Sequence, residues 1–311
     1  MANGKNDRKK FLEVAIAIIV IIIAQFLGID IIPTDSPIEN PEGKLIMTMI
    51  DVEQADCFLL QQGNYVALID CGTEDTEEDV VKFLQEKGIS RIDFLFGTHP
   101  HDDHMGAMAE VITNFEMGTI IYPNVKDGLQ TSNWYEALEE QLESGEYNIE
   151  YSKVGSVYNL GESKIEIIGP ITETTNNLNN YSIVTKVSFG EMNIIMTGDA
   201  EKAVEKELVK SGINLEAEIL KVGHHGSDTS STSEFLDAVN PQYALISCGV
   251  GNIHEHPKEE TMQKLEERNI EVYRTDESGT VVVTITATDI SFSCEPGDYL
   301  SGVELVEREG K

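Results

Sequence analysis

The sequence predicts an α/β protein in which two mixed β-sheets pack face to face and helices cover their outer sides. From residue 44 onward, short apolar strands alternate with helical stretches, and strands also come in runs before and between the helices. The 311 residues, 41% of them hydrophobic, are enough for one large layered domain. All seven histidines fall in three short clusters, each following a predicted strand, where layered α/β proteins assemble their sites.

The N-terminal segment predicts a membrane anchor. Residues 1–10 are basic, and the apolar run from Phe11 to Gly28 is interrupted only by Glu13 and Gln25. A helix of this length covers about 27 Å, close to the roughly 30 Å of a hydrocarbon core. We therefore expect a cytoplasmic tail at 1–10 and a transmembrane helix at 11–32, with the rest of the chain outside. A cleaved signal peptide is the alternative, but no small-residue cleavage site or lipobox cysteine follows the run.

The first half of the domain begins after a proline-containing linker at 33–43, and we place the whole domain at 44–295. Strands at 58–61 and 65–70 flank Gln62-Gly63-Asn64 and predict a hairpin. Apolar residues on one side and a terminating glycine predict a helix at 77–87. Further strands are expected at 45–52, 92–96 and 119–122, helices at 104–115 and 134–142, and loop or edge strand over the rest of 126–163.

The second half opens with a predicted hairpin, in which strands 182–189 and 192–197 are joined across Gly190-Glu191. Helices are then expected at 200–210, 232–239 and 258–268, strands at 218–222, 243–247 and 271–274, and a last hairpin at 280–294. The tail, residues 296–311, is acidic and is expected to be solvated.

The charge balance limits the possible functions. Against 22 basic side chains stand 55 acidic ones, which gives a formal net charge of −33. Such a chain repels polyanions and lacks the basic stripe of a non-catalytic nucleic-acid binder. It does not exclude an enzyme that holds phosphate through metal ions, because those ions dominate the local field.

The four cysteines show no metal-binding spacing. Cys57 and Cys71 flank the first predicted hairpin and lie where a disulfide across the two strands is possible. Free buried thiols are the alternative, because cysteine often serves as a small core residue. The sequence leaves both open and favours the thiols.

The residues that carry chemistry lie at strand ends. His99 and His101, two apart on extended backbone, can point to one metal position, and Asp103 and His104 can face a second one nearby. Asp199, in Thr197-Gly198-Asp199, follows another strand and can bridge the two. Imidazoles mixed with carboxylates suit zinc, manganese or iron, and such ions activate water for hydrolysis.

These motifs resemble the metallo-β-lactamase-fold hydrolases, and more closely the soluble hydrolase domain of ComEC-type competence DNA-uptake proteins. The resemblance implies a metallo-β-lactamase-like αββα four-layer sandwich. It rests on seven segments within residues 46–285: Asp51–Asp56, Leu68–Gly72, Thr98–Gly106, Asn180–Val184, Thr197–Ala200, Leu220–Ser227 and Tyr273–Asp276.

The resemblance also implies a ligand set for one or two divalent ions, zinc or manganese. It puts His99 and His101 at the first metal position and Asp103, His104 and His225 at the second, with Asp199 bridging and Asp70 orienting the ligand loop. The choice of His225 over its neighbour His224 remains open.

One departure from the family pattern concerns the first position. Many members place a further histidine between the first loop and the bridging aspartate, and this chain has none from Met105 to Gly223. The position therefore lacks a ligand, which an oxygen from Asn180 or Ser182 can replace. The departure counts against a true β-lactamase.

Several other polar residues lie beside the site in sequence and can serve the substrate. Lys221 and His224 are candidate catalytic residues beside Asp103, as a phosphate contact and a proton donor. The candidate substrate-binding residues are Ser227, Asn180, His254 and His256. The alternatives are a surface lysine for Lys221, a polar loop for His254 and His256, and a turn for Asn180.

The sequence thus predicts a membrane-anchored, extracytoplasmic metal-dependent hydrolase. The resemblance implies that it is a phosphodiesterase or nuclease acting on DNA, alone or beside separate DNA-uptake machinery. A cell-wall phosphorylcholine-type phosphodiesterase is the first alternative, for which Trp134, Tyr135 and Tyr181 are the candidate aromatic cage. A catalytically silent binding domain is the second alternative.

Overall fold

The computed structural model describes residues 43–125, 130, 132–172 and 176–310. They belong to one compact unit, residues 40–311. The predicted basic tail, anchor helix and all but the end of the linker lie outside the described residues. Among the residues described, no helix combines the length and apolar character needed to cross a membrane.

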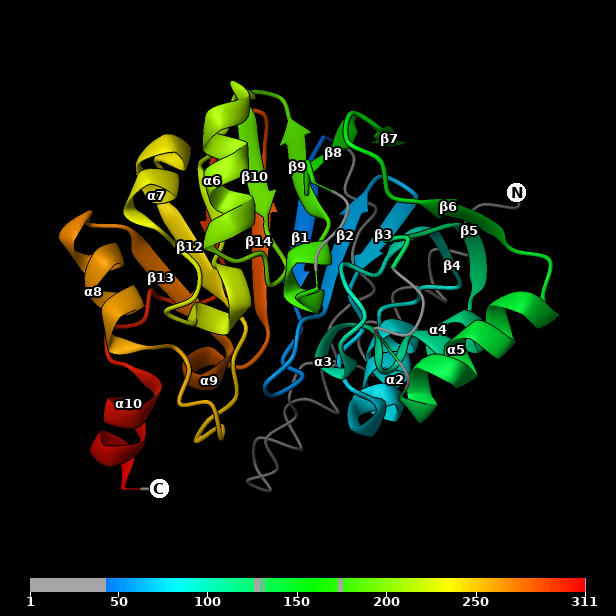
Figure 1. Ribbon diagram of the computed structural model, residues 1–311, viewed down its shortest axis with the longest axis horizontal. Coiled ribbons are helices and arrows are strands. Elements are labelled where there is room, and N and C mark those ends of the chain that lie inside the picture. Colours follow the sequence, from blue (N-terminus) through cyan, green and yellow to red (C-terminus); the bar gives the residue numbers. More distant parts are fainter. Residues whose placement is uncertain (1–42, 126–129, 131, 173–175, 311) are drawn as a thin grey trace, which may run out of the picture. The chain divides into compact units, whose positions relative to one another are not determined.

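Two β-sheets form the centre of this unit (Figure 1). The first has eight strands in the order β15-β14-β1-β2-β3-β4-β5-β6, and the second has seven in the order β13-β12-β11-β10-β9-β8-β7. The strands of the first sheet are β1 Leu45–Met49, β2 Phe58–Gln62, β3 Tyr65–Ile69, β4 Arg91–Phe96, β5 Glu116–Tyr122, β6 Asn148–Tyr151, β14 Val281–Ile285 and β15 Ile290–Phe292. Those of the second are β7 Val157–Leu160, β8 Ser163–Gly169, β9 Val184–Phe189, β10 Met192–Met196, β11 Ile219–Lys221, β12 Tyr243–Ile246 and β13 Glu271–Arg274.

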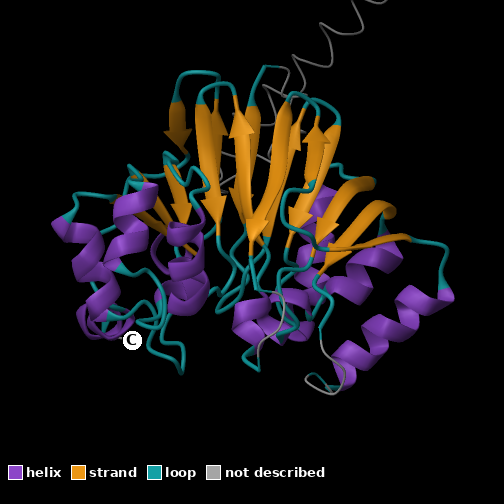
Figure 2. Cartoon of the chain, turned by 45° about the horizontal axis from the view of Figure 1, so that its top comes forward, coloured by secondary structure: helices purple, strands orange, loops and turns teal. Residues whose placement is uncertain are grey.

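Helices flank the strands on both outer sides (Figure 2). On the first sheet lie α2 Glu77–Glu86, α4 Met108–Asn114 and α5 Asn133–Ser144, and on the second α6 Lys202–Ser211, α7 Ser233–Val239 and α8 Glu259–Glu267. Shorter helices are α3 Asp102–Met105, α9 Thr275–Ser278 and the 3₁₀ turns η1 Glu74–Thr76, η2 Leu178–Tyr181 and η3 Gly223–Gly226, and α10 Gly302–Glu309 ends the described chain.

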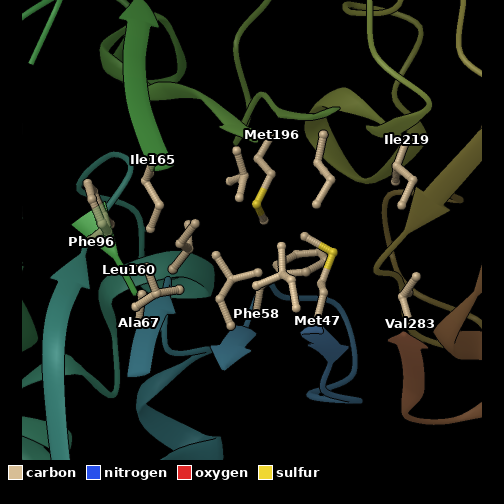
Figure 3. Close-up of a cluster of buried hydrophobic side chains, with 14 of the residues drawn as sticks. Met47, Phe58, Ala67, Phe96, Leu160, Ile165, Met196, Ile219 and Val283 are labelled. Carbon is tan, nitrogen blue, oxygen red and sulfur yellow. The ribbon is translucent and has the colours of Figure 1, made fainter. Parts of the chain in front are cut away.

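Three apolar layers hold these elements together. Between the sheets, side chains such as Met47 and Phe58 of the first sheet meet Ile165 and Met196 of the second (Figure 3). Separate clusters fill the space between each sheet and its own helices. This is an αββα four-layer sandwich, as predicted. Strands such as β1 are buried along their whole length because apolar layers lie on both faces.

The strand direction brings the functional loops together. β3, β4 and β5 are parallel, and so are β10, β11, β12 and β13. The carboxyl ends of parallel strands meet at one edge of a sheet, so the loops that follow them gather there. Figure 2 shows these loops at one end of the strands, between the two groups of helices.

Two predicted elements differ from the structure. The helix expected at 104–115 is divided into α3 and α4 at Ala107, whose ψ of 4° departs from helical geometry. The tail expected to be solvated instead forms α10, which starts in a capping box between Ser301 and Glu304 and buries Leu305 completely. Arg274 also donates a hydrogen bond to the carbonyl of Leu300. The tail prediction was wrong because it weighed acidic composition over these local signals.

The cysteines carry free thiols in the structure. Cys57 and Cys71 are both fully buried beside the ends of β2 and β3, and burial raises the pKa of each thiol well above its ordinary value. The structure therefore has the free core thiols that the sequence favoured over a disulfide.

Candidate metal centre

Asp70 holds the first histidine loop in place. It follows β3 with a φ of 59°, a left-handed conformation that aspartate tolerates better than most residues. Its Oδ1 accepts the Thr98 backbone N–H at 2.7 Å, and its Oδ2 accepts the Thr98 hydroxyl and His104 Nδ1, each at 2.8 Å. The side chain is 1% exposed. It therefore fixes both the start of the loop and the orientation of one imidazole.

The second metal position is formed by Asp103, His104, Asp199 and His225, whose candidate ligand atoms all lie within 4.8 Å of one another. His104 Nε2, His225 Nε2 and Asp199 Oδ1 are buried and have no hydrogen-bond partner. Buried polar atoms are rarely left without partners, and several that converge mark the place of a cation. The residues fit a divalent metal ion.

The tautomers of the two histidines suit this role. His225 Nδ1 lies 2.8 Å from the Ser247 carbonyl and His104 Nδ1 lies 2.8 Å from the Asp70 carboxylate, both of which only accept hydrogen bonds. Each Nδ1 therefore carries the proton, and in the neutral ring each Nε2 turns a lone pair toward Asp199. A partner of this kind is what orients a metal-bound imidazole.

The first metal position is formed by His99, His101 and Asp199, again with ligand atoms within 4.8 Å. Nε2 of His99 and Nδ1 of His101 are 3.0 Å apart. His99 is fully buried, and its Nδ1 lies 3.2 Å from the Ser182 hydroxyl, which also accepts the backbone N–H of Asp199 at 2.9 Å. Ser182 thus ties one ligand loop to the other.

The two oxygens of Asp199 face different positions. Oδ1 lies 3.2 Å from His104 Nε2 and 3.7 Å from His225 Nε2. Oδ2 lies 3.9 Å from His99 Nε2 and 3.5 Å from His224 Nε2. A carboxylate placed in this way can bridge two ions, the role that the sequence analysis expected of Asp199.

The surrounding charges favour a cation at the second position. Burial lowers the pKa of His104, but the carboxylates of Asp199, Asp70 and Asp103 outweigh burial and raise this pKa well above its ordinary value. Burial alone raises the pKa of Asp199 and Asp103, yet the neighbouring histidines hold both pKa values below the ordinary range. Both carboxyl groups are therefore ionised at neutral pH and available to a metal ion.

Asp56 and Lys221 form a buried ion pair next to the metal centre. Asp56 was not among the site residues predicted from the sequence. Asp56 is 1% exposed, and its Oδ1 lies 3.4 Å from His225 Nδ1. Lys221 is also 1% exposed, pairs with Asp56 Oδ2, and donates to the Gly198 carbonyl at 2.9 Å. The only signal for Asp56 was its place in the segment Asp51–Asp56.

This placement corrects two predicted roles. Lys221 was predicted to contact a phosphate, but its ammonium group is enclosed and already paired. Ser227 was predicted to bind substrate, but it is 3% exposed, and its hydroxyl accepts the Thr229 backbone N–H at 3.2 Å within its own loop. Both residues support the site from inside the protein.

The other predicted substrate residues lie around the centre. Asn180 Oδ1 accepts the backbone N–H of Glu201 at 3.1 Å, next to the Asp199 loop. His256 is 5% exposed, and its ring lies 5.4 Å from that of His224, while His254 is exposed. His256 is thus buried next to His224, and this position does not favour contact between His256 and a substrate. His254, in contrast, faces solvent.

Three residues form the open side of the centre. The side chain of Asp103 is 33% exposed and that of His224 is 23% exposed, while His101 is partly exposed. The remaining ligand atoms lie behind them. A substrate can therefore approach both positions across these three side chains.

Comparison with known proteins agrees with this architecture. A family model for the metallo-beta-lactamase superfamily matches residues 50–250. The structure resembles that of CmlA, a diiron beta-hydroxylase from Streptomyces venezuelae, with a TM-score of 0.54, 13% identity, and coverage of 79% of this chain and 54% of that one. At this identity the likeness concerns the fold alone.

Two curated relatives are competence proteins. ComE operon protein 3 of Bacillus subtilis is 33% identical over 205 residues, which are 66% of this chain and 26% of that protein. Competence protein ComA of Neisseria gonorrhoeae is 31% identical over 241 residues, which are 77% of this chain and 32% of that protein. The chain thus spans about a quarter to a third of the length of these relatives.

The four-layer fold, the bridged histidine and aspartate centre and the family match together define a metal-dependent hydrolase of the metallo-β-lactamase superfamily, to which this chain belongs. Within that superfamily it is a ComEC-type protein, related to the competence proteins named above.

Proposed function

We propose that this protein is a phosphodiesterase that cleaves DNA. The observation that carries the proposal is the pair of adjacent metal positions that share Asp199. Two ions a few ångströms apart suit the in-line displacement of a phosphodiester, because one can stabilise the attacking and the other the leaving oxygen. The relation to competence proteins supports DNA as the substrate.

The side chains of this protein would position the metal ions and provide negatively charged ligands for them. His99, His101 and His104 come from one loop that Asp70 holds rigid, and Asp199 fixes the spacing of the two positions. Divalent ions bound there would supply a water nucleophile at neutral pH and offset the charge on phosphorus. Asp103, partly exposed, lies where it can bind a metal ion and orient that water.

We also propose that residues 11–32 anchor the chain in the membrane with the hydrolase domain outside the cell. The apolar run after a basic segment supports this topology.

The alternatives have less support. A choline cage needs open aromatic faces, and Tyr135 and Tyr181 are only 8% and 2% exposed. A silent binding domain has no need for buried ligand atoms without partners, such as His104 Nε2 and His225 Nε2.

The test is release of product from labelled single-stranded DNA by residues 40–311, the compact unit, with Mn²⁺ or Zn²⁺. We expect cleavage that requires metal and falls at least about 100-fold in Asp103→Ala, because a metal ligand at the open face is lost. Asp102→Ala is the matched control, since Asp102 accepts the backbone N–H of Glu74 and does not belong to the metal cluster. Absence of cleavage by protein shown to hold metal would exclude DNA and direct the search to cell-wall phosphodiesters.

A further inference from the structure

The first metal position is short of protein ligands. Its cluster has three residues, His99, His101 and Asp199, whereas the second has four. The two oxygens predicted to fill the gap are already engaged. Ser182 Oγ accepts the Asp199 N–H and lies 3.2 Å from His99 Nδ1, and Asn180 Oδ1 accepts the Glu201 N–H. With Nδ1 of His99 as donor, the tautomer that leaves Nε2 for a metal, its proton is shared between the hydroxyls of Ser182 and Thr98, both at 3.2 Å.

His224 lies on the open side of this position. Its Nε2 is 3.5 Å from Asp199 Oδ2, the oxygen that also faces His99 Nε2. It is on the other side of Asp199 from His104 and His225, which face Oδ1. The two oxygens of Asp199 thus separate the neighbouring histidines: His225 faces Oδ1, and His224 faces Oδ2, the oxygen nearest to His99, although His224 lies outside the group of ligand atoms within 4.8 Å at the first position.

The far nitrogen of His224 also has a hydrogen-bond partner, here a hydroxyl that can donate or accept. Its Nδ1 lies 3.0 Å from the Thr229 hydroxyl, just as His225 Nδ1 lies 2.8 Å from the Ser247 carbonyl. A metal-binding imidazole usually has such a partner on its second nitrogen, because the partner fixes the tautomer and the ring plane.

The backbone conformation that positions the imidazole rings of His224 and His225 is strained. His224 and His225 have φ values of 53° and 52°, the left-handed region that residues with a Cβ rarely occupy in succession. Strain of this kind, about 1 kcal/mol or more per residue, persists where the surroundings require one conformation. Here the double left-handed turn directs two consecutive imidazoles to opposite oxygens of one carboxylate.

We propose that His224 is the missing protein ligand of the first metal position. With His99, His101 and Asp199 it gives the first position four protein donors, as many as the second position has. The chain thereby replaces the histidine that many family members carry before the bridging aspartate. The proposal rests on the metal-dependent hydrolase assignment, and it does not depend on DNA as the substrate.

The test counts metal ions instead of measuring activity. The metal-free full chain is titrated with Zn²⁺ against a competing chelator, and bound zinc is counted after equilibrium dialysis. The variant is His224→Asn, because asparagine tolerates the left-handed backbone at this position and keeps the turn. The matched control is His254→Asn, which changes an exposed histidine of the neighbouring loop.

We expect the wild-type chain and His254→Asn to bind two zinc ions each. We expect His224→Asn to keep the ion at the second position and to bind the ion at the first position at least about 10-fold more weakly, because a ligand is lost. Two ions with unchanged affinities in His224→Asn would overturn the proposal, and so would loss of both ions together. A wild-type chain that binds no zinc would instead refute the metal assignment itself, so the two failures are distinguishable.

A role for His224 as proton donor alone predicts a different result. The variant would then change the pH profile of hydrolysis and leave zinc binding as it is in the wild type. Visible absorption of the Co²⁺-loaded protein gives a second readout of the same question. We expect His224→Asn to change the ligand-field bands and His254→Asn to leave them unchanged, and unchanged bands in His224→Asn would also overturn the proposal.

Discussion

At the scale of single residues, the metal centre depends on carboxylates that sit behind the ligands. Asp70 orients the imidazole of His104, and the carboxylate of Asp56 compensates the positive charge of Lys221 next to His225. The sequence identified the residues with metal-binding side chains, because histidine spacing is visible in one dimension. It did not identify Asp56, because a buried aspartate beside a strand has no spacing that separates it from any other acidic residue.

The Asp56 and Lys221 pair gives the first residue-scale prediction. Lys221→Met should destabilise the protein by about 3–5 kcal/mol, because it leaves the buried Asp56 carboxylate without its partner. The free energy of unfolding in urea measures this loss. Lys82→Met, at an exposed helix position, should change it by less than about 0.5 kcal/mol.

A second variant separates charge balance from packing. In Lys221→Met combined with Asp56→Asn, the unpaired charge is gone, and we expect part of the lost stability to return. If the double variant is as unstable as the sum of both single ones, the pair does not act through charge compensation.

At the scale of elements, strands and helices with clear periodicity were predictable, and short irregular pieces were not. The sequence predicted α2 and the β2–β3 hairpin to within one or two residues, because apolar spacing and turn residues agree there. It missed α10, whose composition is that of a solvated tail. The capping box of Ser301 and Glu304 was readable in the sequence, whereas the complete burial of Leu305 is visible only once the neighbouring elements are in place.

The C-terminal helix gives an element-scale prediction. Leu305 is fully buried, so Leu305→Ala should cost about 2–5 kcal/mol through lost burial and the cavity left behind. Val303, on the same helix but 42% exposed, is the matched control, and Val303→Ala should cost less than about 0.5 kcal/mol. Chemical denaturation measures both. Equal, small effects would mean that α10 does not contribute to stability.

The edge strands give a pH-dependent prediction. Tyr158 of β7 donates a hydrogen bond to Glu150 of β6 at 2.9 Å, and so joins the edges of the two sheets. Burial and then Glu150 raise the pKa of Tyr158 to about 12. Below pH 10 neither the folded nor the unfolded chain ionises this tyrosine. Between pH 10 and about 12 only the unfolded chain does, so stability should fall there as pH rises.

Tyr158→Phe tests this slope. The variant should be less stable at pH 7 by about 1–3 kcal/mol, because the hydrogen bond to a carboxylate is lost. Above pH 10 the difference from wild type should shrink, since phenylalanine has no proton to lose. Unfolding measured from pH 7 to 12 gives both values, with exposed Tyr65→Phe as the control. A difference that stays constant across this range would contradict the raised pKa.

At the scale of the whole molecule, the layered fold followed from the sequence because it depends on repeated local patterns, and the histidine and aspartate clusters that the structure brings together were visible as motifs. The resemblance put His225 at the second position and left the choice over His224 open, and nothing in the sequence assigned His224 to the first position. That assignment depends on which oxygen of Asp199 each ring faces, and that is decided by a left-handed turn between two histidines that are adjacent in the chain. Adjacent residues of one type are equivalent in a sequence and become distinct only in three dimensions.

The net charge gives the last prediction, which also tests the proposed substrate. A chain with a formal charge of −33 repels DNA at long range, whereas ions bound at the metal centre attract the phosphates. Added salt screens the repulsion over distances beyond about 10 Å but affects the contacts inside the site less. We therefore expect kcat/KM on single-stranded DNA to rise several-fold between about 50 and 200 mM salt, whereas proteins that bind DNA through a basic surface lose affinity over this range. A small phosphodiester with one charge, measured in parallel, should show little change. A fall in kcat/KM on DNA with added salt would mean that a basic contact, and not the metal centre alone, draws the substrate to this protein.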